Sequence, residues 1–210
     1  MYYFLQRMHE DDIPRVQEIE RQSFTAPWSA NTYRRELGMP ETSRYLVARS
    51  SSTLPPDEPP APPNRRLPLL RALLPPFAKP SPPSPYPIVG YGGLWLMVDE
   101  GHITTIAVSP AHRGQGIGEL LLNGLIDQAI DVKATRLTLE VRISNEPAQR
   151  LYLKYGFQPS GTRPRYYTDN GEDALIMWTD VITEPAYVQR LEELRERLAV
   201  RLQRKAGMIS

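Results

Sequence analysis

The sequence predicts an α/β fold in which one mixed, mostly antiparallel sheet carries helices on both faces. Six segments have the alternation or β-branched content of strands, and four others repeat apolar residues at helical spacing. Their order is strand, helix, helix, three strands, helix, strand, helix, strand, so strand and helix alternate after the central strands. These segments belong to about 147 of the 210 residues, the usual size of one domain. We expect a sheet of about six to seven strands.

The first half of the domain supplies four strands and two helices. Asp11 or Asp12 can cap the first helix, which ends before Pro27. Ser29 can cap the second helix, and Gly38 ends it. The predicted strands are residues 2–8, residues 44–50 and two long strands within 87–110 that are joined by a turn at 99–101.

The second half opens with glycines and continues with alternating helices and strands. A helix with a broad apolar face is predicted from Gly116 to Asp131. It is followed by a β-branched strand over 135–142, a short helix over 145–155 that Asn145 can cap and Gly156 closes, and a last strand over 174–182.

Two additions stand outside this plan. Residues 51–87 hold 14 of the 22 prolines and are expected to be a mobile insertion within a domain that spans residues 1–184. Inside the insertion, residues 64–77 combine leucines with three arginines, which could dock on a partner or a membrane surface. A disordered loop whose leucines cover a local patch is the favoured alternative, because prolines bracket the segment closely.

The second addition, residues 185–210, is predicted to be a C-terminal amphipathic helix and tail. Its apolar residues recur at steps of three and four among glutamates and arginines: Val188, Leu191, Leu194, Leu198 and Leu202. This stripe can pack on its own domain or pair with a second copy as a homodimer, and the sequence leaves both open.

Composition excludes several classes of function. With 25 Lys and Arg against 24 Asp and Glu, nothing in the net charge favours direct binding to nucleic acid or to an anionic membrane. The absence of cysteine excludes a thiol nucleophile, and three histidines without ligand spacing argue against a metal site. No signal peptide and no apolar run of membrane-spanning length is present, so we expect a cytoplasmic protein without a membrane span.

A run of three alternate glycines, "RGQGIG" at 113–118, follows a predicted strand and opens a helix. It has neither the third glycine of a dinucleotide fingerprint nor the Lys-Ser or Lys-Thr of a nucleotide triphosphate loop. Free N–H groups at a helix start favour an anion such as a pyrophosphate. The alternative, a tight turn that lets the helix pack closely, is about equally consistent with the glycines alone.

The surrounding sequence resembles one enzyme superfamily. "IAVSPAHRGQGIGELLL" resembles the acyl-coenzyme A pyrophosphate motif of the GNAT acetyltransferases. The run "LTLEVRISNEPAQRLYLKYGF", together with "SF..PWS" after the first helix, resembles the RimI-type ribosomal-protein alanine N-acetyltransferases. The resemblance implies the GNAT fold, acetyl-CoA as cosubstrate, a protein N-terminus as acceptor, and these cofactor-binding residues: Ile106, Ala107, Val108, Arg113, Gly114, Gln115, Gly116, Ile117, Gly118, Glu119 and Asn145.

The resemblance also implies catalytic roles for Glu140 and Tyr152. Glu140 lies on a strand among core residues, and the matching glutamate of the family takes the proton of the amine, through a water. Tyr152, at the family's general-acid position, would protonate the leaving thiolate. The alternatives are an ion pair of Glu140 with Arg142 or Arg136 and a packing role for Tyr152 on one helical face.

Acceptor recognition is assigned by resemblance to two facing loops. One loop carries Phe24, Pro27 and Trp28, and the other carries Tyr166 and Tyr167, although a core role for Trp28 is as consistent. Making a lysine neutral near pH 7 costs about 3 kcal/mol more than making an α-amine neutral, which favours the α-amine.

Other functions stay open at this point. The alternatives are acetylation of lysine side chains or small-molecule amines, and a non-catalytic acyl-CoA binding scaffold. Glu119 departs from the family pattern: pointing inward it would weaken cofactor binding, and pointing outward it would stabilise the helix start. The insertion and the C-terminal helix are absent from compact members of the family, so either could alter the acceptor.

Overall fold

The computed structural model describes residues 1–53 and 84–207 and contains a seven-stranded sheet. The strand order is β1-β2-β3-β4-β5-β7-β6, and only β4 and β5 run parallel. The predicted mixed, mostly antiparallel sheet is therefore confirmed. The strands are β1 (Tyr2–Arg7), β2 (Ser43–Ser51), β3 (Ile88–Met97), β4 (Glu100–Val108), β5 (Arg136–Arg142), β6 (Phe157–Tyr167) and β7 (Glu172–Thr179).

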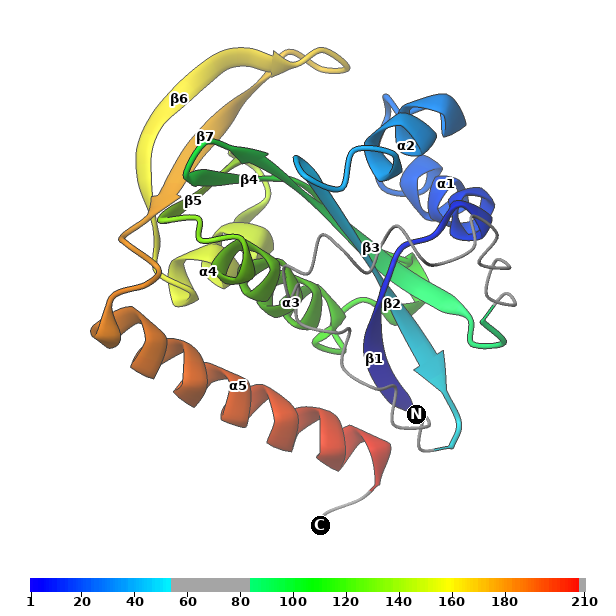
Figure 1. The fold of residues 1–210 in the computed structure, drawn as a ribbon. Helices are drawn as coiled ribbons and strands as arrows, with labels where there is room; N and C mark the ends of the chain where they lie inside the picture. The colour runs from blue at the N-terminus through cyan, green and yellow to red at the C-terminus, as the bar shows by residue number, and fades with distance from the viewer. Residues whose placement is uncertain (54–83, 208–210) are drawn as a thin grey trace, which may run out of the picture.

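Helices cover both faces of the sheet, as predicted (Figure 1). One face carries α1 (Ile13–Arg21) and α2 (Ala30–Leu37), and Tyr33 of α2 is fully buried in the smaller apolar core on this face. The other face carries α3 (Ile117–Asp131), α4 (Glu146–Lys154) and α5 (Pro185–Ala206), which share the larger apolar core. Ser29 caps α2 by accepting a hydrogen bond from the Thr32 amide at 3.1 Å. Side-chain capping thus marks the start of α2, and apolar periodicity decides which face the helices bury.

The strand β6 was not expected, and this is the main correction to the predicted element order. Its sequence, "FQPSGTRPRYY", holds two prolines and a glycine, residues that usually interrupt strands. The pairing of β6 with β7 shifts register after Pro159 and again between Arg163 and Tyr167. Because β6 is an edge strand with bulges, it accommodates these residues, and their presence hides the strand in the sequence.

A second, smaller correction concerns the turn between β3 and β4. It lies at Val98 and Asp99, whereas the prediction placed it at residues 99–101. Val98 has a φ of 58°, an unusual value for a β-branched residue. Gly101 belongs to β4, where an added Cβ atom would lie 2.5 Å from the Leu137 side chain. The glycine therefore serves close packing between strands, and its turn-forming character misled the prediction.

The parallel strands β4 and β5 separate toward their carboxyl ends. Their pairing runs from Glu100 opposite Arg136 to Ile103 opposite Leu139. The register of β3 with β4 shifts opposite Thr104, which bends β4 at the same level. Beyond this point the two strands leave a gap in the sheet, and the segments that follow each of them lead into α3 and α4.

The C-terminal helix packs on its own chain. Tyr187, Leu191, Leu194 and Leu198 of α5 are buried, and α5 runs alongside the layer formed by α3 and α4 (Figure 1). The apolar stripe that could have paired with a second copy is thus engaged within the chain. A homodimer through this stripe would require α5 to leave the core.

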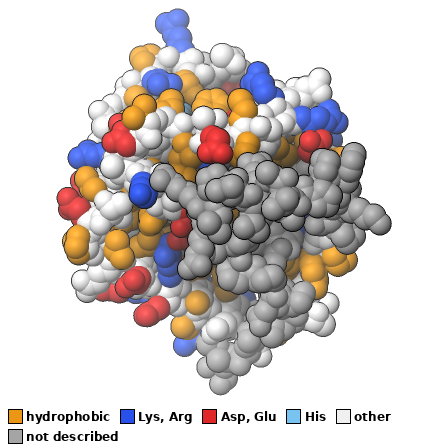
Figure 2. All heavy atoms as spheres, viewed as in Figure 1, with side chains coloured by type: hydrophobic (Ala, Val, Ile, Leu, Met, Phe, Trp, Pro, Cys, Tyr) orange, Lys and Arg blue, Asp and Glu red, His pale blue; other side chains and the backbone are white. Residues whose placement is uncertain are grey.

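Several expectations concern residues 54–83, which lie outside the described residues. They include most of the predicted insertion at 51–87 and all of the leucine-rich segment at 64–77. Among the described helices, none is long and apolar enough to cross a membrane. Acidic and basic side chains are interspersed on the face shown in Figure 2, consistent with the near-zero net charge.

Candidate active site

A cavity of about 490 Å³ opens where β4 and β5 separate. Its walls are these two strands, the loop between α1 and α2, the start of α4 and the turn between β6 and β7. Predicted catalytic, cofactor and acceptor residues meet here: Phe24, Trp28, Ile106, Glu140, Asn145, Tyr152, Tyr166 and Tyr167. The gap in the sheet therefore brings together residues that are far apart in the sequence.

Glu140 is the carboxylate at the point where the strands separate. His102 Nε2 lies 2.7 Å from its Oε2 atom, and Arg163 Nη1 lies 3.1 Å from its Oε1 atom. The hydrogen bond with His102, aided by the charges of His102 and Arg163, holds the pKa of Glu140 below its ordinary value although burial opposes this. Glu140 is therefore ionised at neutral pH, and its partners differ from the Arg142 or Arg136 of the alternative reading.

Tyr152 borders the same cavity from α4. Its ring lies 5.7 Å from that of Phe157, and neighbours on its helix, Ala148 and Leu151, pack against the core. Burial, with a smaller effect of Tyr167, raises the pKa of the Tyr152 phenol above its ordinary value. The ring has the packing role of the alternative reading, while its phenol stays protonated at neutral pH on the edge of the cavity.

The glycine loop joins β4 to α3 in a conformation that needs glycine. Gly114 has a φ of 71° and Gly116 a φ of 94°, both in the left-handed region. Gly116 is the N-cap of α3 and has no side chain to occupy the free N–H groups of the first turn. Those N–H groups and the helix dipole suit the phosphates of coenzyme A, so the loop fits that cosubstrate.

The other predicted cofactor residues lie along this path in different ways. Ile106 lines the cavity, Ala107 is buried on the α1 side of the sheet, and Ile117 is buried in the larger core, so the latter two can reach a ligand only through their backbone. Val108 packs against the larger core, and Gly118 lies in α3. The Arg113 side chain donates hydrogen bonds to the Val108 carbonyl and to Ser23. The Gln115 side chain accepts a hydrogen bond from the Tyr3 hydroxyl. Asn145 caps α4 through the Ala148 amide at 3.3 Å, as expected.

Glu119 points neither to the loop nor to solvent. It is buried, and its carboxylate accepts hydrogen bonds from Lys154 at 2.6 Å, Tyr155 at 2.8 Å and Arg201 at 2.5 Å. Burial raises the pKa of Glu119, but the three hydrogen bonds outweigh it and hold the pKa below its ordinary value. Its negative charge is thus neutralised by partners from α4 and α5, an arrangement that neither sequence expectation included.

Most of the predicted acceptor residues line the opposite side of the cavity. Phe24, Trp28, Tyr166 and Tyr167 do so, and the rings of Tyr166 and Tyr167 meet edge to face at 5.2 Å. Trp28 also stacks on Trp95 at 5.9 Å, so its core role and its place at the cavity coexist. Pro27 is exposed and does not line the cavity.

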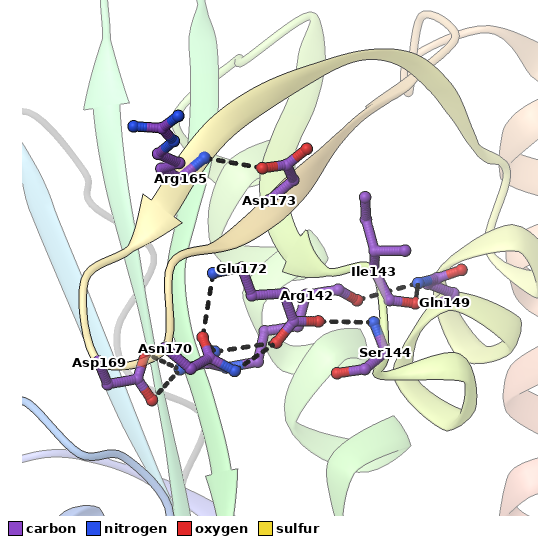
Figure 3. Close-up of polar contacts among 9 residues, drawn as sticks. All are labelled: Arg142, Ile143, Ser144, Gln149, Arg165, Asp169, Asn170, Glu172 and Asp173. Carbon is purple, nitrogen blue, oxygen red and sulfur yellow. Dashed lines mark hydrogen bonds and ion pairs between the residues drawn. The ribbon is translucent and has the colours of Figure 1, made fainter.

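Arg142 organises the turn between β6 and β7 (Figure 3). Its Nη2 atom donates to both carboxylate oxygens of Asp169 at 2.9 Å, and its Nη1 atom lies 3.0 Å from Glu172. The guanidinium also stacks 3.8 Å from the centroid of the Tyr167 ring. The Ser144 amide donates to Glu172 at 2.8 Å, which ties the turn to the start of α4. The aromatic wall of the cavity is therefore held by a fork of charged hydrogen bonds.

Sequence reasoning missed His102 and the Arg142 network as parts of the site. The pairing of β4 with β5 sets His102 opposite Thr138, and so brings its ring to Glu140. No local motif encodes this register. Among the described residues, no cluster of three or more potential metal ligands is found.

The comparisons with known proteins agree with this geometry. The model of the Acetyltransferase (GNAT) family matches residues 83–157. A Bacillus subtilis (strain 168) protein named putative ribosomal protein bS18-alanine N-acetyltransferase is 38% identical over 177 residues, which are 84% of this chain and 95% of that protein. The N-alpha-acetyltransferase RimI of Mycobacterium tuberculosis is 33% identical over 175 residues, 80% of this chain and 87% of its own length.

Solved structures give the same result. The Escherichia coli ribosomal-protein-S18-alanine N-acetyltransferase superposes with a TM-score of 0.62 at 26% identity, covering 85% of this chain and 94% of that one. The PaiA N-acetyltransferase of Thermoplasma acidophilum, solved with coenzyme A, shares the fold with a TM-score of 0.58 at 14% identity, covering 86% of this chain and 99% of that one. The chain therefore belongs to the GNAT acetyltransferase family as a RimI-like, acetyl-CoA dependent N-acetyltransferase.

Proposed function

We propose that the protein transfers the acetyl group of acetyl-CoA to the N-terminal α-amine of a protein, a ribosomal protein that begins with alanine. The observation that carries this proposal is the single cavity in which Glu140, Tyr152 and the aromatic acceptor wall meet beside the gap between β4 and β5. Relatives that are named ribosomal-protein alanine N-acetyltransferases support the choice of acceptor. Such an acceptor is made in the cytoplasm, and we assign the protein to that compartment.

In the proposed mechanism Glu140 accepts the proton of the attacking amine, directly or through one water. Its lowered pKa keeps the carboxylate ionised, and His102 and Arg163 fix both of its oxygens. A carboxylate of low basicity suits an α-amine, about half of which is already neutral near pH 8, better than a lysine side chain, which is almost fully protonated there. His102 lies 2.7 Å from Glu140 and holds its Oε2 atom in place.

Tyr152 supplies the proton at the other end of the reaction. Acetyl-CoA provides a thioester carbonyl and a thiolate leaving group. The raised pKa of the Tyr152 phenol keeps its hydroxyl protonated until that group departs. Backbone N–H groups of the glycine loop would hold the phosphates, and Asn145, the N-cap of α4, lines the cavity together with Glu140. The catalytic domain in this proposal is residues 1–184 with an insertion at 51–87, followed by the helix and tail at 185–210.

A panel of acceptors tests the proposal. Peptides with a free N-terminal alanine are compared with N-terminally blocked peptides that carry an internal lysine, and with free polyamines. We expect the α-amine to react about 100-fold faster in kcat/KM, because about 3 kcal/mol separates the cost of neutralising the two amines. Acetylation of lysine peptides or polyamines alone would refute the proposed acceptor, and transfer to none of the panel would favour a non-catalytic scaffold.

A further inference from the structure

The last two turns of α5 lie against the glycine loop. An added Cβ atom at Gly116 would lie 3.3 Å from a Leu202 methyl group and 3.4 Å from a Leu198 methyl group. Lys205 Nζ donates to the Gly114 carbonyl at 2.9 Å. The first turns of α5 cover the apolar core through Tyr187 and Leu191, so the helix has two different contact regions. Only the second region reaches the predicted phosphate site.

The polar contacts of this second region meet at Glu119, in the first turn of α3. Arg201 Nη2 lies 2.5 Å from Glu119 Oε2, while Lys154 and Tyr155 bind Oε1 from the end of α4. Glu119 is ionised because these donors hold its pKa below the ordinary value. Its carboxylate would therefore repel a bound diphosphate unless cations compensate it.

Within the described part of the chain, four cationic side chains contact or belong to the loop and the first turn of α3: Arg113, Lys154, Arg201 and Lys205. Two of the four come from α5. Without the two from α5, only Arg113 and Lys154 would offset the negative charge of Glu119. The C-terminal helix thus raises the summed charge of these side chains and Glu119 from +1 (two cations and one carboxylate) to +3 (four cations and one carboxylate), which favours a ligand with several phosphates.

We propose that α5 is part of the cofactor site, with Arg201 as a positioning residue that neutralises Glu119 and fixes the first turn of α3. Lys205 acts as a second positioning residue, because its hydrogen bond to the Gly114 carbonyl holds the glycine loop. The affinity for coenzyme A then depends on the C-terminal helix, although α5 lies far from Glu140 along the chain. This inference rests on the proposed use of the glycine loop as the phosphate site.

Calorimetric titration with coenzyme A tests the inference without any need for an acceptor. We expect Arg201→Gln to weaken binding about five- to tenfold at low salt, and less at high salt because exposed charges are screened. Glu119→Gln should bind at least as tightly as the wild type. The double variant should return to within about twofold of Glu119→Gln, since the uncompensated carboxylate is gone. Arg197→Gln, which removes a charge paired with Glu193 on the same helix, is the control.

The outcomes separate this inference from the function on which it rests. Failure of the wild-type protein to bind coenzyme A would remove the phosphate site and the inference with it. If the wild type binds and Arg201→Gln binds equally well, the inference alone is wrong. A double variant that binds coenzyme A as weakly as Arg201→Gln would also overturn the inference. If Arg201 served only to hold the fold together, removing Glu119 as well would break further hydrogen bonds and could not restore the affinity. Thermal unfolding of each variant confirms that a folded protein is titrated.

Discussion

The cofactor side and the acceptor side of the cavity are built in different ways. The proposed cofactor side begins with β4, which lines the cavity, and continues into the glycine loop and α3, all within one continuous segment of residues 100–131. The acceptor side joins the loop after α1 to the turn between β6 and β7, two segments that lie near opposite ends of the domain's sequence. One side is therefore a local motif, and the other exists only when the whole sheet is formed.

The two sides also use charge differently. On the cofactor side, Lys154, Tyr155 and Arg201 bind one carboxylate, Glu119, in the first turn of α3. On the acceptor side, Arg142 is neutralised by Asp169 and Glu172, which leaves aromatic rings to form the wall. Under the proposed function, we therefore expect the first side to bind an anion through its positive charge, and the second to bind the acceptor through its aromatic wall, which the charged groups hold in place.

The largest expected effect lies where the two sides meet. Glu140→Gln and Tyr152→Phe should each lower kcat about 100- to 10,000-fold, the usual contribution of a positioned base or acid. Coenzyme A binding, measured by calorimetry, should stay within about twofold of the wild type, since neither side chain belongs to the phosphate loop. Arg136→Gln, an exposed position on the same strand as Glu140, serves as control. Unchanged turnover in both variants would remove the acid and base assignments.

The local side was the more predictable one. Helix caps such as Ser29 and Asn145, the loop glycines Gly114 and Gly116 and the apolar face of α3 follow from local rules, and the structure bears them out, whereas Gly101 lies in a strand and not in the predicted turn. The strand β6 could not be predicted because its prolines do not favour a strand locally, and only its bulged pairing with β7 makes it one. The partners of Glu140 and Glu119 were also beyond reach, since strand register and the docking of α5 bring them together.

Substitutions on the acceptor side should weaken peptide binding without changing the affinity for coenzyme A. We expect Arg142→Gln to raise KM for the peptide about tenfold, equivalent to about 1.4 kcal/mol, because the bidentate bond to Asp169 and the contact with Tyr167 are lost. Binding of coenzyme A should not change. Arg142→Lys keeps the charge without the fork and should fall between the two. Arg150→Gln, which removes an exposed arginine of α4, is the control.

Steady-state kinetics and calorimetry on the same preparations check this prediction. A rise in peptide KM that is matched by equal weakening of coenzyme A binding would indicate general destabilisation. An unchanged KM would show that the turn needs no support from Arg142.

The smallest expected effect is the response of the same turn to acid. Hydrogen bonds from Ser144, followed by those of Arg142 and Asn170, lower the pKa of Glu172 to about 2 against an opposing effect of burial. Because the folded-state pKa is lowered, the contribution of Glu172 to stability is complete above the ordinary value of 4.5 and is lost as the pH falls through about 2. NMR titration of the glutamate side chains should find this carboxyl group still ionised at pH values where exposed glutamates are protonated. Arg142→Gln should raise the pKa of Glu172 only in part, since the Ser144 amide still donates. Titration of Glu172 near 4.5 in the wild type would mean that the hydrogen bonds from Ser144 and Arg142 do not hold this carboxylate in solution.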